Sequence, residues 1–314
     1  MDRPDHSEPS PAPIPGGSPP SYPGYPAAGP PGYPPAPGPP GPALTPAGGN
    51  NVPFLDVPGA PPATRAAAGV WILFALMGFA GGQVVAVILT YVAAAVAGQS
   101  AQLQQIANLS QPPEWYVGTS LVGLWIGFLA GPWVASKARG TGHFFADLGV
   151  RFRPIDLLGL AIGPAGQLLV GIMYAPFIKH LKNFTAPTQK LTGASHGGGF
   201  LVIAVMTVVG APFFEELFFR GLLFKALARL FTPTALGPST RRTIGIVVAV
   251  VVDGLLFGAA HAELAQLAGL AVFGMILAFV SYRTGRLGMN MVSHASFNLV
   301  AVIAVLNSRG TIWH

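Results

Sequence analysis

The residues best suited to chemistry lie in the second half of the chain, inside runs of apolar residues. Two adjacent carboxylates, Glu215 and Glu216, stand in the segment APFFEELFFRGLLF and are followed by Arg220. On a helix, Glu216 and Arg220 are four residues apart and can pair on one face, whereas Glu215 points about 100° away and stays free. Ionisable groups are costly within a membrane, so they indicate a functional site. A purely structural Glu–Arg pair at a helix end is the alternative.

Two further apolar segments carry histidines. Asp253, Phe257 and His261 recur every fourth residue, which places them on one helix face. His294 and Asn298 have the same spacing in NMVSHASFN. Each pattern is weak alone, because a single histidine is often structural and polar residues four apart often join membrane helices.

Together the three segments supply the groups that a buried hydrolytic centre needs. A carboxylate and an imidazole can activate water as a general base. A second imidazole and an amide N–H can stabilise an oxyanion. Carboxylate and imidazole also suit zinc, although the chain has no HExxH pair.

Membrane helices are the elements that must position these groups. Of the 314 residues, 51% are apolar and only 9% are charged, against about 25% charged in soluble domains. We therefore expect an all-α, polytopic membrane helix bundle, since about 20 apolar residues cross a bilayer. Seven spans are expected, with six to eight possible, and the fourth can run longer than its apolar core. They cover residues 67–97, 116–135, 157–178, 198–218, 244–261, 264–282 and 287–306.

The beginning of the chain has a different composition. Residues 1–62 hold 22 of the 32 prolines, in runs such as SYPGYPAAGPPGYPP. Such a segment cannot build a packed core, so residues 1–64 are predicted to be a disordered cytoplasmic tail and residues 65–314 the membrane domain. A Pro-rich ligand for a partner protein is the alternative reading of the tail. No signal peptide is expected, since no apolar stretch follows the N-terminal charges.

The distribution of basic residues predicts the orientation. With the N-terminus inside, 13 of the 17 Lys and Arg residues fall on the cytoplasmic side, which fits a multi-pass protein of the cell membrane. The net charge of +6 needs no nucleic-acid partner, because no basic stripe with interleaved aromatics is present. Without cysteine, disulfides, thiolate metal sites and a cysteine nucleophile are excluded.

The three segments resemble the motifs of the CPBP intramembrane proteases, which include the type II CAAX prenyl endopeptidases and bacteriocin-processing relatives. The motifs EExxxR, FxxxH and HxxxN occur in that order within residues 211–298. The resemblance spans residues 145–306, because FADLGVRFR at 145–153 is similar to the family's usual lead-in. Residues 1–62 lie outside it.

The resemblance implies an α-helical membrane endopeptidase that cleaves a membrane-associated, CAAX-like or peptide-precursor substrate with an activated water. Its partners would be the lipid bilayer and that substrate. Carried over by motif position, Glu215 is the base, His261 assists it, and His294 and Asn298 stabilise the oxyanion. In a metalloprotease variant, Glu215, His261 and His294 would bind zinc; we prefer a mechanism without tightly bound zinc, since the two histidines lack the close spacing of a ligand pair. The supporting residues are Glu216, Arg220 and Phe257.

Two other functions stay open. A non-catalytic scaffold or bacteriocin-immunity protein could keep the same fold. A small transporter could use the same residues as a proton relay, but it should show an internal repeat, and none is visible.

The endopeptidase hypothesis requires Glu215, His261, His294 and Asn298 to meet at one cavity, which we expect to open to the cytoplasm. A simple count of helical rise places Glu215 and His261 at opposite ends of their spans. We therefore expect a helix to be broken or shifted, with Pro212, Gly254 and Gly258 as candidate positions.

Overall fold

The computed structural model describes residues 65–109, 111–177, 197–232 and 240–308. All of them belong to one compact unit, Gly48–His314. The predicted disordered tail, residues 1–64, lies outside the described residues. Every regular element in the described ranges is helical, which confirms the all-α prediction.

Within the described residues, seven helices are long and apolar enough to cross a membrane, as predicted. The first three spans are α1 (Arg65–Val96), α3 (Glu114–Arg139) and Pro154–Tyr174, which ends in α5 (Gly159–Tyr174). The last three are α10 (Thr240–Ala260), α11 (Leu264–Thr284) and α12 (Gly288–Ser308). The short helices α2 (Leu103–Ala107) and α4 (Phe144–Leu148) lie in the connections.

The fourth span, Gly198–Phe231, is longer than its predicted core of 198–218. It comprises α7 (Gly197–Val205), α8 (Ala211–Glu215) and α9 (Lys225–Phe231), joined by π-helical turns at Met206–Gly210 and Glu216–Phe224. Pro212 has no N–H to donate to the preceding turn, which accounts for a change of helical register there. The predicted shift near Pro212 is therefore present, as a change of winding within one span.

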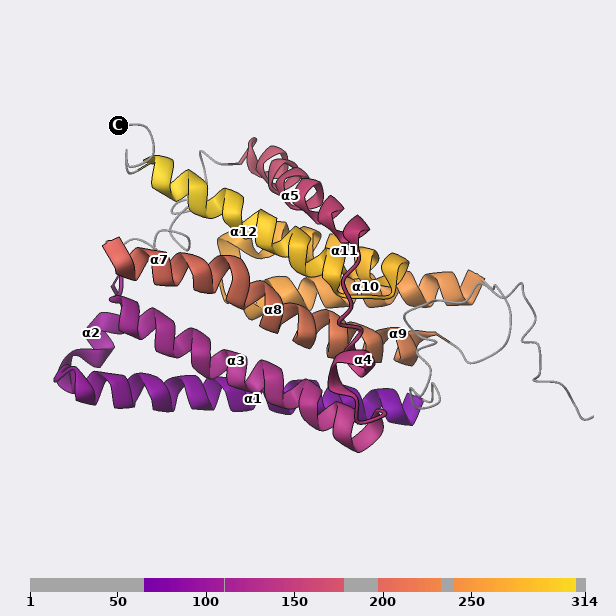
Figure 1. The fold of residues 1–314 in the computed structure, drawn as a ribbon, viewed down its shortest axis with the longest axis horizontal. Helices are drawn as coiled ribbons and strands as arrows, with labels where there is room; N and C mark the ends of the chain where they lie inside the picture. The colour runs from indigo at the N-terminus through magenta and orange to yellow at the C-terminus, as the bar shows by residue number, and fades with distance from the viewer. Residues whose placement is uncertain (1–64, 110, 178–196, 233–239, 309–314) are drawn as a thin grey trace, which may run out of the picture. The chain divides into compact units, whose positions relative to one another are not determined.

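The fourth span lies between two groups of helices. Figure 1 shows α7, α8 and α9 running between the α1–α3 pair and the group formed by α10, α11 and α12. The interior around it is aromatic: the ring of Phe218 stacks on Phe128 of α3 at 4.3 Å, and Phe219 meets Phe257 of α10 at 5.2 Å. Both faces of this span are therefore covered by protein where the carboxylates lie.

Gly254 and Gly258 do not break α10, which runs continuously from Thr240 to Ala260. The expected break at these glycines is wrong. Their role is close packing, because a Cβ at either position would lie 2.6 Å from a backbone oxygen of α11, that of Ala271 or Leu267. A methyl group does not fit at that distance, so these glycines set how closely α10 and α11 approach.

Glycines also bring α1 and α3 into backbone contact. A Cβ at Gly78 would lie 2.8 Å from the carbonyl oxygen of Gly127, and one at Gly82 would lie 2.9 Å from that of Leu124. Small residues at such spacing let membrane helices pack through their backbones.

We expect Gly78→Ala to separate α1 from α3 and to destabilise the protein by about 1–3 kcal/mol, the usual cost of overpacking. Gly81→Ala is the matched control on the same helix, because no atom lies within 4 Å of a Cβ there. Thermal unfolding in detergent measures both. Equal melting temperatures for the two variants would contradict the close contact.

Hydrogen bonds and an ion pair hold the connections at the bundle end where α3 ends and α12 begins. Asp147 in α4 accepts hydrogen bonds from Ser136 (2.6 Å) and from the backbone N–H and hydroxyl of Thr141. Burial alone would raise the pKa of Asp147, but these hydrogen bonds outweigh it and hold the pKa below its usual value. Asp156 pairs with Arg286 at 2.6 Å, which ties the start of the third span to the turn before α12.

Candidate active site

The pair predicted from the EExxxR segment is present and fully buried. Arg220 Nη1 lies 2.9 Å from Glu216 Oε1, and both side chains are 0% exposed. The guanidinium also donates from Nη2 to the carbonyl of Gly274 at 3.0 Å and lies over the ring of Phe257 at 4.4 Å. Three spans therefore hold Arg220, which is too deeply buried to be a pair at a helix end.

His294 of α12 lies between the two carboxylates. Its Nδ1 is 2.9 Å from Glu216 Oε1, and its Nε2 is 3.8 Å from Glu215 Oε2. The imidazole is flanked by the rings of Phe257 and Phe273, at 5.5 and 5.8 Å between ring centroids. The EExxxR and HxxxN segments thus meet at one histidine.

Glu215 differs from its neighbour in having an unused oxygen. Its side chain is 13% exposed, and Oε2 has no hydrogen-bond partner among the described residues. Glu216, in contrast, accepts hydrogen bonds at both oxygens. Adjacent residues in one helix therefore provide one fully bonded carboxylate and one that is free to bind a water, as the spacing predicts.

His261 follows the last residue of α10 and is exposed. Its Nδ1 lies 2.8 Å from the carbonyl oxygen of Phe257, which can only accept, so Nδ1 carries a proton and Nε2 is left as an acceptor. Desolvation by the surrounding protein lowers the pKa of His261, and Arg220 adds to this effect, while the hydrogen bond to Phe257 opposes it. A lowered pKa favours the neutral imidazole, which is the form that can accept a proton.

Phe257 links the two histidines. Its ring lies 4.9 Å from the imidazole of His261 and 5.5 Å from that of His294, so the imidazoles are at most about 10 Å apart. Glu215 and His261 therefore do not lie at opposite ends of their spans. The fourth span is long, and Glu215 lies near its middle.

Asn298 lies one turn beyond His294 on α12. Its Nδ2 donates to the carbonyl oxygen of Thr207, in the first π-helical turn, at 2.8 Å. The amide has a second N–H, so one donor is still available for a ligand.

The sequence analysis did not identify Asn290 as a site residue, and it named no partner for Asp253. Asn290 Nδ2 donates to Glu216 Oε2 at 3.2 Å and to the carbonyl oxygen of Leu277 at 2.7 Å. Asp253 Oδ2 lies 3.4 Å from Arg220 Nε. Asn290 stands four residues before His294, the same spacing that identified Asn298, so the signal was present in the sequence.

The predicted zinc ligands were tested against the donor geometry. In the described part of the chain, no three His, Asp or Glu side chains are grouped closely enough to hold a metal ion. Glu215, His261 and His294 in this arrangement therefore do not fit a zinc site.

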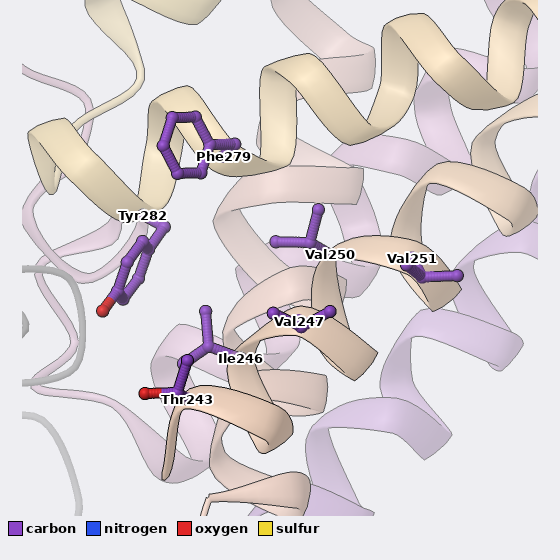
Figure 2. Close-up of a pocket in the computed structure, with 7 residues that line it drawn as sticks. All are labelled: Thr243, Ile246, Val247, Val250, Val251, Phe279 and Tyr282. Atoms are coloured by element: carbon purple, nitrogen blue, oxygen red, sulfur yellow. The ribbon is translucent and has the colours of Figure 1, made fainter. Parts of the chain in front are cut away.

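A pocket of about 220 Å³ lies elsewhere, between the beginning of α10 and the end of α11. Figure 2 shows its lining, with Phe279 and Tyr282 from α11 and Thr243, Ile246 and three valines from α10. It contains none of the predicted site residues and offers almost no polar surface. The predicted common cavity is thus not this pocket.

The position of His261 conflicts with the predicted cytoplasmic opening. Because α1 is the first span and α10 the fifth, the end of α10 lies at the bundle end opposite to the beginning of α1 (Figure 1). His261 directly follows the end of α10. The described turns at that end, residues 97–109 and 261–263, contain no Lys or Arg. An N-terminus inside and a site that opens to the cytoplasm through His261 cannot both hold.

Comparison with known proteins gives a family match in the second half of the chain. Residues 197–300 match the family model described as type II CAAX prenyl endopeptidase Rce1-like. The match includes all three motifs and is consistent with a CPBP intramembrane protease. No curated protein and no solved structure matches the chain.

Proposed function

We propose, on the premise that residues 197–300 form an Rce1-like domain, that the chain is an endopeptidase that hydrolyses a peptide bond of a membrane-associated substrate. The observation that carries the proposal is the environment of Glu215. Its Oε2 is buried, has no hydrogen-bond partner in the described part of the chain, and lies 3.8 Å from Nε2 of His294. One water molecule can bind both atoms, in a setting that favours proton transfer.

In the proposed reaction, Glu215 takes a proton from this water, and the oxygen attacks the carbonyl carbon of the scissile bond. The negative charge that develops on the carbonyl oxygen is stabilised by N–H donors, the free one of Asn298 and Nε2–H of protonated His294. The opposite ring nitrogen, Nδ1, lies 2.9 Å from Glu216 Oε1. The proton then passes to the leaving amine, with His261 as an assisting acceptor and donor near the opening.

This mechanism uses only side chains and water. We expect the purified protein to cleave quenched peptides at an unchanged rate after EDTA or 1,10-phenanthroline treatment, because no ligand group for zinc is assembled. Elemental analysis of the same sample is the control. Stoichiometric zinc together with loss of cleavage on chelation would overturn the metal-free reaction.

We further propose that substrate enters at the bundle end that carries His261. The exposed imidazole is at that end, and the ring of Phe257 contacts both it and His294, the histidine beside the carboxylates. With the N-terminus inside, this is the non-cytoplasmic face, so the substrate is a segment on or near the outer leaflet.

The chain contains no cysteine, so single cysteines report this orientation cleanly. We expect Gln104→Cys in α2 to react with a membrane-impermeant maleimide in intact cells, and Arg139→Cys at the end of α3 to react only after lysis; both positions are exposed and lie at opposite ends. The reverse pattern would place His261 on the cytoplasmic side and restore the original prediction of the opening.

A further inference from the structure

Asp253 is the buried charge that the three motifs leave unexplained. It is 0% exposed, one turn before Phe257 on α10, and neither of its oxygens has a hydrogen-bond partner among the described residues. Its nearest cationic atom is Nε of Arg220, at 3.4 Å. Burying a carboxylate costs several kcal/mol unless a cation compensates it, so Arg220 accounts for the presence of Asp253.

Arg220 in turn has its three nitrogens directed at three different elements. Nη1 donates to Glu216, Nη2 donates to the carbonyl of Gly274, and Nε lies 3.4 Å from Asp253 without forming a hydrogen bond. The two hydrogen bonds set the plane of the guanidinium. The charge of Asp253 attracts Arg220 to the position from which Nη1 meets Glu216.

Glu216 receives a second fixed donor from Asn290. The carbonyl oxygen of Leu277 can only accept, so Nδ2 of Asn290 is correctly assigned, and it also donates to Glu216 Oε2. Both oxygens of Glu216 accept N–H donors, so this carboxylate is ionised. Its Oε1 then accepts the Nδ1 proton of His294, which directs Nε2 at Glu215.

From these contacts we infer that Asp253 and Asn290 are positioning residues that set the orientation and protonated ring nitrogen of His294 through Arg220 and Glu216. The inference rests on the proposed function for its catalytic consequence, but the geometry of His294 can be measured without any activity. Neither residue belongs to the EExxxR, FxxxH or HxxxN motifs.

Asp253→Asn and Asn290→Ala should leave KM unchanged and lower kcat at least about 10-fold on the quenched peptides, in line with the effect of outer partners on catalytic ligands. Asp156→Asn is the matched control, because it neutralises another buried aspartate that pairs with an arginine, Arg286, outside this network. It is expected to lower the melting temperature with no effect on kcat. An equal loss of kcat in all three variants would reduce the role of Asp253 and Asn290 to general stability.

Unfolding of Asp253 variants tests the first link of the network. Asp253→Asn should lower the melting temperature when Arg220 is present and raise it in an Arg220→Met background, where Asp253 is an unpaired buried charge. The same sign in both backgrounds would show that Arg220 does not hold Asp253.

The deciding experiment is a ¹⁵N spectrum of histidine-labelled protein in detergent, with His294 assigned by His294→Gln. We expect its Nδ1 to be a hydrogen-bonded N–H in the parent and to lose that signature in Asp253→Asn and in Asn290→Ala, but not in Asp156→Asn. Unchanged His294 signals in both network variants overturn the inference. Changed signals without cleavage of any peptide by the parent support the positioning network and contradict the endopeptidase instead.

Discussion

Glu215→Gln abolishes peptide cleavage and leaves the protein folded. We expect kcat to fall by about 10²- to 10⁴-fold, the usual contribution of a general base. Gln has the same shape but cannot accept the proton of the attacking water. Since Glu215 Oε2 has no hydrogen-bond partner among the described residues, the substitution breaks no hydrogen bond at that atom and changes only its 3.8 Å contact with Nε2 of His294. The measurement is steady-state cleavage of a panel of prenylated and unprenylated quenched peptides.

Glu216→Gln is the matched control for this prediction. It makes the same chemical change one residue along the helix, but it removes the charge that Arg220 and His294 share. We expect it to lower both the melting temperature and kcat. Full activity of Glu215→Gln would refute the assignment of the base.

The Glu215 variants also separate the three functional classes. A scaffold or immunity protein would keep its protective effect without Glu215, and a transporter would lose flux. Loss of cleavage in Glu215→Gln, with no change in ion flux in liposomes, is the outcome that we expect.

Arg220→Met causes the largest expected loss of stability. The substitution leaves Glu216 and Asp253, both 0% exposed, without their shared cation. Breaking a buried ion pair from one side costs about 3–5 kcal/mol. The side-chain volume is nearly kept, so the effect reports charge and hydrogen bonding, and thermal unfolding in detergent measures it.

Arg286→Met is the comparison for Arg220→Met. Arg286 also pairs with a buried aspartate, Asp156, but its side chain is 12% exposed and water can replace part of the lost interaction. We expect a clearly smaller drop in melting temperature. A drop as large as that of Arg220→Met would show that burial does not decide the cost.

Local spacing predicted the parts of the site that lie on one helix. The pairing of Glu216 with Arg220 and the free oxygen of Glu215 follow from residue spacing alone, because neighbours four apart meet on one helix face. The seven spans follow from apolar length in the same way.

Contacts between helices could not be predicted in this way. Asn290 contributes through Glu216, a residue 74 positions earlier, and nothing in the local sequence shows which helix face it meets. The π-helical turns have no simple sequence signature beyond Pro212. An estimate from the rise per residue of a regular helix therefore gave the wrong position of Glu215 relative to His261. The sequence does not show whether Gly254 and Gly258 act as hinges or as packing residues. The neighbouring backbone of α11 distinguishes these two roles.

The backbone contact between α1 and α3 has a consequence for how the protein is made. α1 and α3 precede the Rce1-like segment in the chain, and their contact includes glycines that need no residue from later in the chain. The hairpin can therefore close in the bilayer before the Rce1-like segment is synthesised. The fourth span, which carries the charged residues Glu216 and Arg220, then enters the membrane beside the α1–α3 pair, which has already assembled. Its polar groups are therefore exposed to less lipid during insertion.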